Sequence, residues 1–159
     1  MRIYLLIPFL IFTQALYSQT SVWDSWDPEV LRSLHTGNGI PFLSEEEQKV
    51  VQIMNLARYD ADRFAESFLK ASVEENKPEN TTYLRSLYRD LKAANGLDPL
   101  IPEKDLSDVA QGHALRSGRT GHVGHRDINN RFAPLRGNPY MAWGENCSYG
   151  YADAIDIVI

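Results

Sequence analysis

Two short segments carry the residue types that could form a chemical site. His122 and His125 lie in a glycine-bounded stretch, and Glu145 stands about twenty residues later in a Gly-Glu-Asn string. Imidazole and carboxylate groups are common zinc ligands and common acids and bases in catalysis. We therefore expect His125 and Glu145 to meet at one site, which would bind a metal ion or transfer protons.

Structural roles compete with these functional ones. His113 shares a predicted helical face with apolar residues, so we expect a packed histidine with one satisfied nitrogen rather than a ligand. Glu145 could pair instead with a loop arginine, Arg126 or Arg131, because a guanidinium matches a carboxylate in shape and charge. His122 with His125 is a competing local pair of metal ligands, and it has no third donor nearby.

Two further residues follow Glu145 on the same segment. If this segment is a regular strand, alternate residues face one side, so Tyr149 would lie on the same side as Glu145. It would then either wall a cleft or be buried as a core residue. Cys147 is the only cysteine, so it cannot form an internal disulfide. We expect its thiol to be a small buried apolar group.

Length and composition limit the class of protein. Residues 1–18 combine Arg2 with an apolar run too short to span a bilayer and end at the small Ser18, which predicts a cleaved signal peptide and export to the periplasm or the extracellular space. No membrane span is expected after its removal. The net charge of −5 gives no reason to expect nucleic acid as a partner. We expect an irregular leader over residues 19–43 and one domain over residues 44–159.

Hydrophobic periodicity predicts several helices and one strand. Ser44 and Glu47 form a capping-box pattern before a helix expected over residues 45–69. Two more helices are expected over residues 81–94 and from Pro102 to just before Gly118, followed by a long loop over residues 119–140. Residues 141–151 are interpreted as a strand, and Asp153 as the cap of a last helix.

The motifs together resemble the CAP superfamily, which comprises cysteine-rich secretory proteins, antigen five and pathogenesis-related proteins. The matching segments are residues 110–114, Gly124-His125, residues 143–146, Tyr149-Gly150, Asn55 with Arg58, and residues 96–100. The resemblance covers residues 44–159. It implies an α+β fold, a three-layer α-β-α sandwich, with a cleft floored by two histidines and two acids.

In some members of that family these four residues hold zinc or another divalent cation. Here His125 matches the first histidine and Glu145 matches the first acid, while the second acid and the second histidine would follow residue 159. We therefore expect a fragment of the domain, incomplete at the C-terminus. Two ligands alone would bind a divalent cation weakly, because zinc sites typically use three or four protein donors.

Two classes of function follow from these residues. The preferred one is a secreted, non-catalytic domain whose cleft of His125, Glu145 and Tyr149 takes a small molecule, a lipid or a peptide. The alternative is a metal-assisted hydrolase or protease, with Glu145 as the base and His125 beside it. A third option is a secreted surface protein with a non-functional cleft. The oligomeric state stays open.

Overall fold

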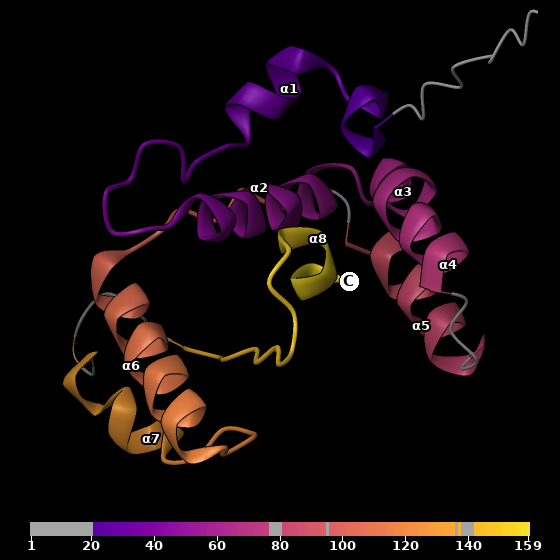
Figure 1. Ribbon diagram of the computed structural model, residues 1–159. Coiled ribbons are helices and arrows are strands. Elements are labelled where there is room, and N and C mark those ends of the chain that lie inside the picture. The colour runs from indigo at the N-terminus through magenta and orange to yellow at the C-terminus, as the bar shows by residue number, and fades with distance from the viewer. Residues whose placement is uncertain (1–20, 77–80, 95, 136, 138–141) are drawn as a thin grey trace, which may run out of the picture.

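The structure is a computed structural model that describes residues 21–76, 81–94, 96–135, 137 and 142–159. The proposed signal peptide, residues 1–18, lies outside the described residues. In the described part of the chain all regular structure is helical, and Figure 1 shows coils without arrows. The predicted α+β three-layer sandwich is therefore wrong for this chain, because such a sandwich needs a central sheet and the described residues contain no strand.

The leader is part of the fold rather than an irregular cover. It forms a 3-10 turn, η1 (Val22–Ser25), and a short helix, α1 (Pro28–Ser33), which begins at an Asp27 cap. Trp26 and Leu34 are buried, and the Trp26 indole N–H donates to Ser67 Oγ at 3.2 Å. The tryptophan and leucine of this segment therefore pack as core residues.

The predicted helix over residues 45–69 is divided into two. Helix α2 (Glu45–Tyr59) begins at Ser44 with the predicted capping box, in which Ser44 and Glu47 each bond the other's backbone N–H. It ends at Asp60, whose side chain accepts from Arg63 N at 3.0 Å and caps the next helix. The apolar spacing continues across this bend, so periodicity alone does not reveal it.

After Asp60 the chain runs as one continuous helical stretch through α3 (Ala61–Phe64), a π-helical turn η2 (Ala65–Leu69) and α4 (Lys70–Asn76). This stretch extends beyond the predicted end at residue 69. Pro78, the predicted breaker, lies outside the described residues. Helix α5 (Thr81–Lys92) follows, close to its predicted bounds, and packs Leu84, Tyr88 and Leu91 against the core.

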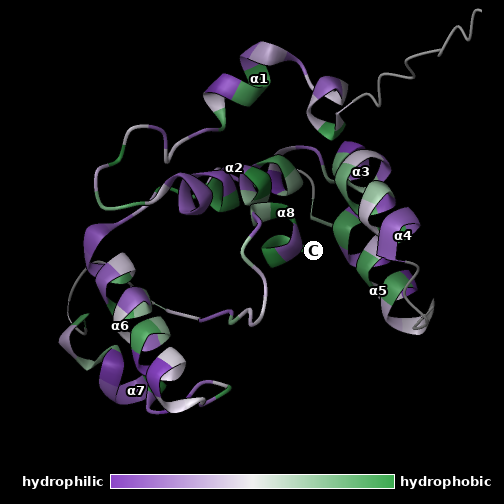
Figure 2. Ribbon diagram, viewed as in Figure 1, coloured by the Kyte–Doolittle hydropathy of each residue, from purple (hydrophilic) through white to green (hydrophobic). Residues whose placement is uncertain are grey.

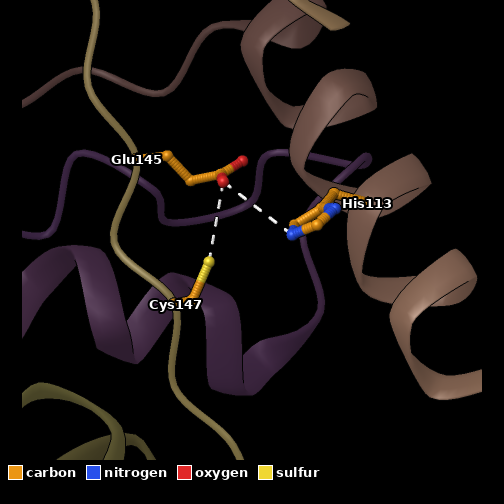
Figure 3. Close-up of side chains that lie close together, drawn as sticks. All are labelled: His113, Glu145 and Cys147. Atoms are coloured by element: carbon orange, nitrogen blue, oxygen red, sulfur yellow. Dashed lines mark hydrogen bonds and ion pairs between the residues drawn. The ribbon is translucent and has the colours of Figure 1, made fainter. Parts of the chain in front are cut away.

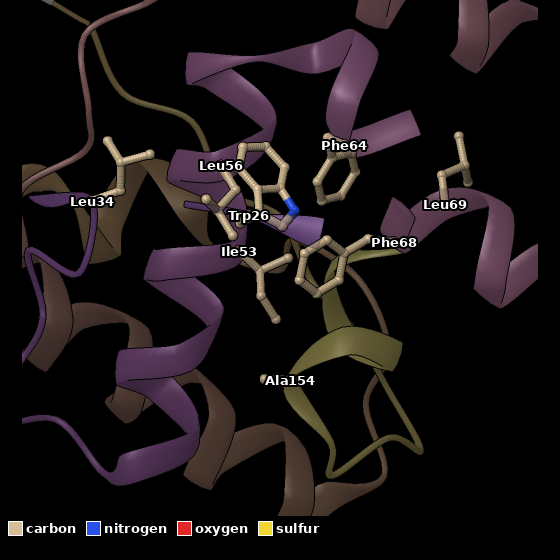
Figure 4. Packing of buried hydrophobic residues seen from close by; sticks show 8 residues of the cluster. All are labelled: Trp26, Leu34, Ile53, Leu56, Phe64, Phe68, Leu69 and Ala154. Carbon is tan, nitrogen blue, oxygen red and sulfur yellow. The ribbon is translucent and has the colours of Figure 1, made fainter. Parts of the chain in front are cut away.

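Aromatic and aliphatic side chains of the leader, α2, α3, η2 and the last helix, α8 (Ala154–Val158), form one hydrophobic core (Figure 4). Phe64 stacks on Phe68 with ring centroids 5.5 Å apart, and Trp23 meets Phe68 edge-on at 4.9 Å. Hydrophobic residues of these elements are coloured green on the ribbon in Figure 2. The buried members are Trp26, Leu34, Ile53, Leu56, Phe64, Phe68, Leu69 and Ala154.

Asn55 is a polar anchor within this apolar region, fully buried on α2. Its amide nitrogen donates to Leu34 O at 3.0 Å and to Leu100 O at 3.2 Å, and its oxygen accepts from Leu100 N at 2.6 Å. The same amide nitrogen reaches Thr36 Oγ1 at 3.0 Å. One side chain thereby satisfies backbone groups of two segments distant in sequence, the leader and the segment around Leu100.

Helix α6 (Lys104–Thr120) is longer than predicted. It runs through Gly118 and ends at Gly121, which adopts the left-handed conformation with φ 68°. Glycine takes this conformation without a steric cost, so the true stop signal is Gly121. The predicted loop that follows contains a short helix, α7 (Ile128–Arg131), and a 3-10 turn, η3 (Ala133–Leu135). Both α6 and α7 lie at the lower left of Figure 1.

The predicted strand over residues 141–151 is wrong. Its described part, residues 142–151, is not strand and pairs with no neighbouring strand in the described structure. A strand needs a partner for its backbone groups, and these residues also lack the alternation of apolar and polar side chains that marks a half-buried strand. The last helix, α8 (Ala154–Val158), is capped by Asp153 as predicted and packs on α2.

In the described residues, no helix combines the length and apolar character that crossing a bilayer requires.

Candidate metal and ligand site

Four elements bring the candidate residues together. His113 lies on α6, on the helical face that also carries Leu106 and Ala110, three and four residues apart as a shared face requires. The turn after Gly121 carries His125, and α7 carries Arg131. The segment 142–153 passes by with Glu145, Cys147 and Tyr149.

Glu145 is held by Arg131 through two hydrogen bonds. Arg131 Nη2 donates to Oε1 at 2.7 Å, and Nη1 donates to Oε2. Both side chains are nearly buried, with exposures of 5% for Arg131 and 9% for Glu145. The alternative that paired Glu145 with a loop arginine is thus found for Arg131, while Arg126 contributes its carbonyl oxygen, which accepts from Arg131 Nε at 3.0 Å.

The predicted meeting of His125 and Glu145 is confirmed. His125 Nδ1 lies 3.0 Å from Glu145 Oε1. The imidazole is about half exposed, at 52%, so one side of this contact faces solvent. A carboxylate oxygen only accepts, so Nδ1 carries the proton in this contact.

His113 is buried, as expected for a packed histidine, with 7% exposure. Its Nε2 lies 2.9 Å from Gly124 O and 3.8 Å from Glu145 Oε1. Because a carbonyl oxygen can only accept, Nε2 carries a hydrogen and donates it. His113 therefore fixes the peptide that immediately precedes His125.

Cys147 is not the buried apolar group that the sequence predicts. It is half-buried, and its Sγ lies 3.6 Å from His125 Nδ1 and 3.6 Å from Glu145 Oε1. His113, Glu145 and Cys147 each offer a ligand atom within 4.8 Å of the others, so this group could hold a metal ion. Figure 3 shows the Glu145 carboxylate between the His113 imidazole and the Cys147 thiol.

Tyr149 and His122 are the two remaining residues of the predicted site. The Tyr149 hydroxyl accepts from Gly124 N at 2.9 Å and donates to Gly124 O at 3.4 Å, so it holds the histidine-bearing turn. It is 39% exposed. His122 is half-buried and does not belong to the group of three potential ligands found in the described residues.

The ion pair between Arg131 and Glu145 shifts the pKa values of both side chains. The guanidinium hydrogen bonds lower the pKa of Glu145 from 4.5 to about 2, with the His125 contact acting in the same direction and burial opposing it. The carboxylate raises the pKa of Arg131 in return. Glu145 is therefore ionised throughout the physiological range, as a metal ligand must be.

A pocket of about 390 Å³ adjoins the cluster, and apolar side chains form most of its wall. Phe132 and Trp143 stack at one side, with ring centroids 5.9 Å apart and an interplanar angle of 10°. Of the predicted cleft residues only Glu145 is part of the wall, while His125 and Tyr149 lie beyond it. The lining residues are Leu106, Ala110, Phe132, Leu135, Ala142, Trp143, Gly144, Glu145 and Asn146.

That Cys147 lies beside Glu145 and His125 was not predicted from the sequence. Its spacing from Glu145 was an available signal, because residues i and i+2 of an extended segment point to the same side even without a partner strand. The spatial approach of His113 to Gly124 had no comparable local signal.

A comparison with protein-family models, curated proteins and solved structures finds no match to this chain. The resemblance to the CAP superfamily thus depends on the motifs alone.

Proposed function

We propose that this chain is a secreted, CAP-like binding module that takes a small molecule with an apolar body, such as a lipid, in the pocket beside Glu145. A zinc ion held by the neighbouring cluster would form the polar rim of that pocket. Glu145 carries this proposal, because it lines the pocket and also belongs to the group that could hold a metal. A mostly apolar cavity with a few convergent polar groups is the usual form of a small-molecule site.

The alternative as a metal-assisted hydrolase has less support. A general base works best when its pKa lies near the working pH. The pKa of Glu145 is lowered to about 2 by Arg131, and both of its oxygens already accept hydrogen bonds from the guanidinium. Such a carboxylate stays ionised and accepts a proton poorly.

The pocket is tested with an apolar fluorescent probe, 8-anilinonaphthalene-1-sulfonate. Ala110 lines the pocket, so Ala110→Trp fills it, while Gln111→Trp adds the same indole to the next, exposed position of α6. We expect the probe's fluorescence enhancement to fall several-fold in Ala110→Trp and to persist in Gln111→Trp. Equal enhancement in the wild type, Ala110→Trp and Gln111→Trp would contradict binding in the pocket. It would favour the option of a surface protein with a non-functional cleft.

The metal is tested by calorimetric titration of Zn²⁺ into the wild type, Glu145→Gln and Glu103→Gln. Glu103 is an exposed acid whose side chain makes no capping bond, so its variant controls for the loss of one charge. We expect the wild type and Glu103→Gln to bind one equivalent and Glu145→Gln to bind at least about tenfold more weakly. Equal affinities would remove Glu145 from the site.

A further inference from the structure

Building on the proposed zinc site, we infer that three atoms coordinate the ion: His125 Nδ1, Glu145 Oε1 and Cys147 Sγ. In this assignment the cysteine is a ligand, and His113 stays outside the coordination shell as a positioning residue. The inference rests on the proposed function, because it specifies how the proposed ion is held.

The distances between these three atoms match a tetrahedral site. Zinc bonds of about 2.3 Å to sulfur and about 2.05 Å to nitrogen or oxygen, at tetrahedral angles, separate sulfur from each lighter ligand by about 3.6 Å. The observed Sγ separations from Nδ1 and Oε1 are both 3.6 Å. The same geometry separates nitrogen from oxygen by about 3.3 Å, and the observed distance is 3.0 Å.

The hydrogen bonds distinguish the two histidines. If the ion replaced the proton on His125 Nδ1, the acceptor of that proton, Glu145 Oε1, would become a ligand of the same ion. No acceptor would lose its partner, and the ring proton would move to Nε2 on a side chain that is 52% exposed. Binding at His125 therefore breaks no hydrogen bond without replacing it.

His113 is in the opposite situation. If its Nε2 bound the ion, it would lose the hydrogen that it donates to Gly124 O, and that oxygen would retain only the longer contact of 3.4 Å to the Tyr149 hydroxyl. Leaving a partly buried acceptor poorly satisfied costs free energy. The same bond holds Gly124 in place, so His113 acts on the site by orienting the turn that carries His125.

The ligand set also determines which metals bind. A thiolate favours zinc and other borderline or soft cations, whereas Mg²⁺ and Ca²⁺ prefer sites made of oxygen atoms. Three protein ligands leave one tetrahedral position for water or for a polar group of the bound molecule. On binding, the thiol proton of Cys147 passes to solvent, while the ring proton of His125 moves from Nδ1 to Nε2.

Cobalt spectroscopy tests this assignment, because a cysteine ligand gives Co²⁺ a sulfur charge-transfer band in the near ultraviolet. Co²⁺ is added to the reduced wild type, Cys147→Ser, His113→Gln and the neighbouring control Ser148→Ala. The glutamine amide can still donate to Gly124 O, so it preserves the positioning bond and removes the imidazole. We expect the band in all proteins except Cys147→Ser, which should bind at least about tenfold more weakly.

Three outcomes would overturn the inference. If the wild type binds Co²⁺ without a sulfur band, and Cys147→Ser binds equally well, the assignment fails while the metal site stands. If His113→Gln loses as much affinity as Cys147→Ser, His113 is a ligand and the assignment is wrong. If the wild type binds neither Zn²⁺ nor Co²⁺, the proposed function fails together with this inference.

Discussion

At the scale of single residues, Glu145 is the point where all the proposed interactions meet. It receives two hydrogen bonds from Arg131, contacts His125 and Cys147, and lines the apolar pocket. A nearly buried carboxylate is stable only when it is paired. Arg131 is thus the internal counter-charge of Glu145, and in the proposed complex the same carboxylate would bridge the guanidinium and the ion.

The low pKa of Glu145 predicts a stability loss in acid. A carboxylate whose pKa falls from 4.5 to about 2 on folding stabilises the folded protein fully above pH 4.5. This contribution disappears as the pH falls through about 2, and at 1.4 kcal/mol per unit it amounts to about 3 kcal/mol. We expect the difference in free energy of unfolding between wild type and Glu145→Gln to shrink by that order between pH 5 and pH 2, measured by urea unfolding. A constant difference would contradict the pairing.

Removing the Arg131 side chain should make the stability of the protein depend more strongly on bound zinc. Arg131→Met leaves the nearly buried Glu145 without a counter-charge, and breaking such a pair typically costs about 3 kcal/mol or more. Because Zn²⁺ would supply the missing positive charge, we expect zinc to raise the melting temperature more in Arg131→Met than in the wild type. Calorimetric melting with and without zinc measures this. An equal rise in both proteins would show that the ion does not reach Glu145.

At the scale of elements, local signals predicted helices well and the strand badly. Capping residues such as Ser44 and Asp153 place donors and acceptors within three residues of a helix start, so sequence alone locates them. The division of residues 45–69 at Asp60 was missed, because the apolar spacing continues through the bend. The prediction of a strand over residues 141–151 was wrong because strand pairing depends on a distant partner, which no local pattern reveals.

Asn55 should contribute more to the free energy of unfolding than its position in the apolar pattern of α2 suggests. Its side chain bonds the leader and residue 100 to α2, so Asn55→Ala leaves several buried backbone groups unsatisfied. Each such group costs roughly 1 to 3 kcal/mol, and we expect a total loss of about 3 kcal/mol in urea unfolding. Lys49→Ala, on the exposed side of the same helix, is the control and should change little. Comparable losses in both variants would contradict this role.

At the scale of the whole molecule, the core and the site use different elements. The described hydrophobic cluster draws on the leader, α2, α3, η2 and α8. The site draws on α6, the turn after it, α7 and residues 142–149. Sequence reasoning predicted the His125–Glu145 contact and offered Arg131 as a partner. It missed Cys147 and the His113–Gly124 bond, because the approach of α6 to the later segment depends on tertiary structure.

This division predicts where zinc stabilises the molecule. An ion bound by His125, Glu145 and Cys147 would link the turn after α6 to the later extended segment. In hydrogen exchange with mass spectrometry we expect zinc to slow exchange in residues 121–127 and 144–148 and to leave α2 unchanged. Slowing across all helices to the same extent would indicate general stabilisation, and unchanged exchange around residue 145 would place the ion elsewhere.

The most direct measurement is anomalous diffraction at the zinc absorption edge from crystals of the protein grown with Zn²⁺. We predict one strong peak at about 2.0 to 2.3 Å from His125 Nδ1, Glu145 Oε1 and Cys147 Sγ, with His113 Nε2 still bonded to Gly124 O. A zinc peak bound elsewhere, or an intact His125–Glu145 contact with no peak beside it at saturating zinc, would contradict it.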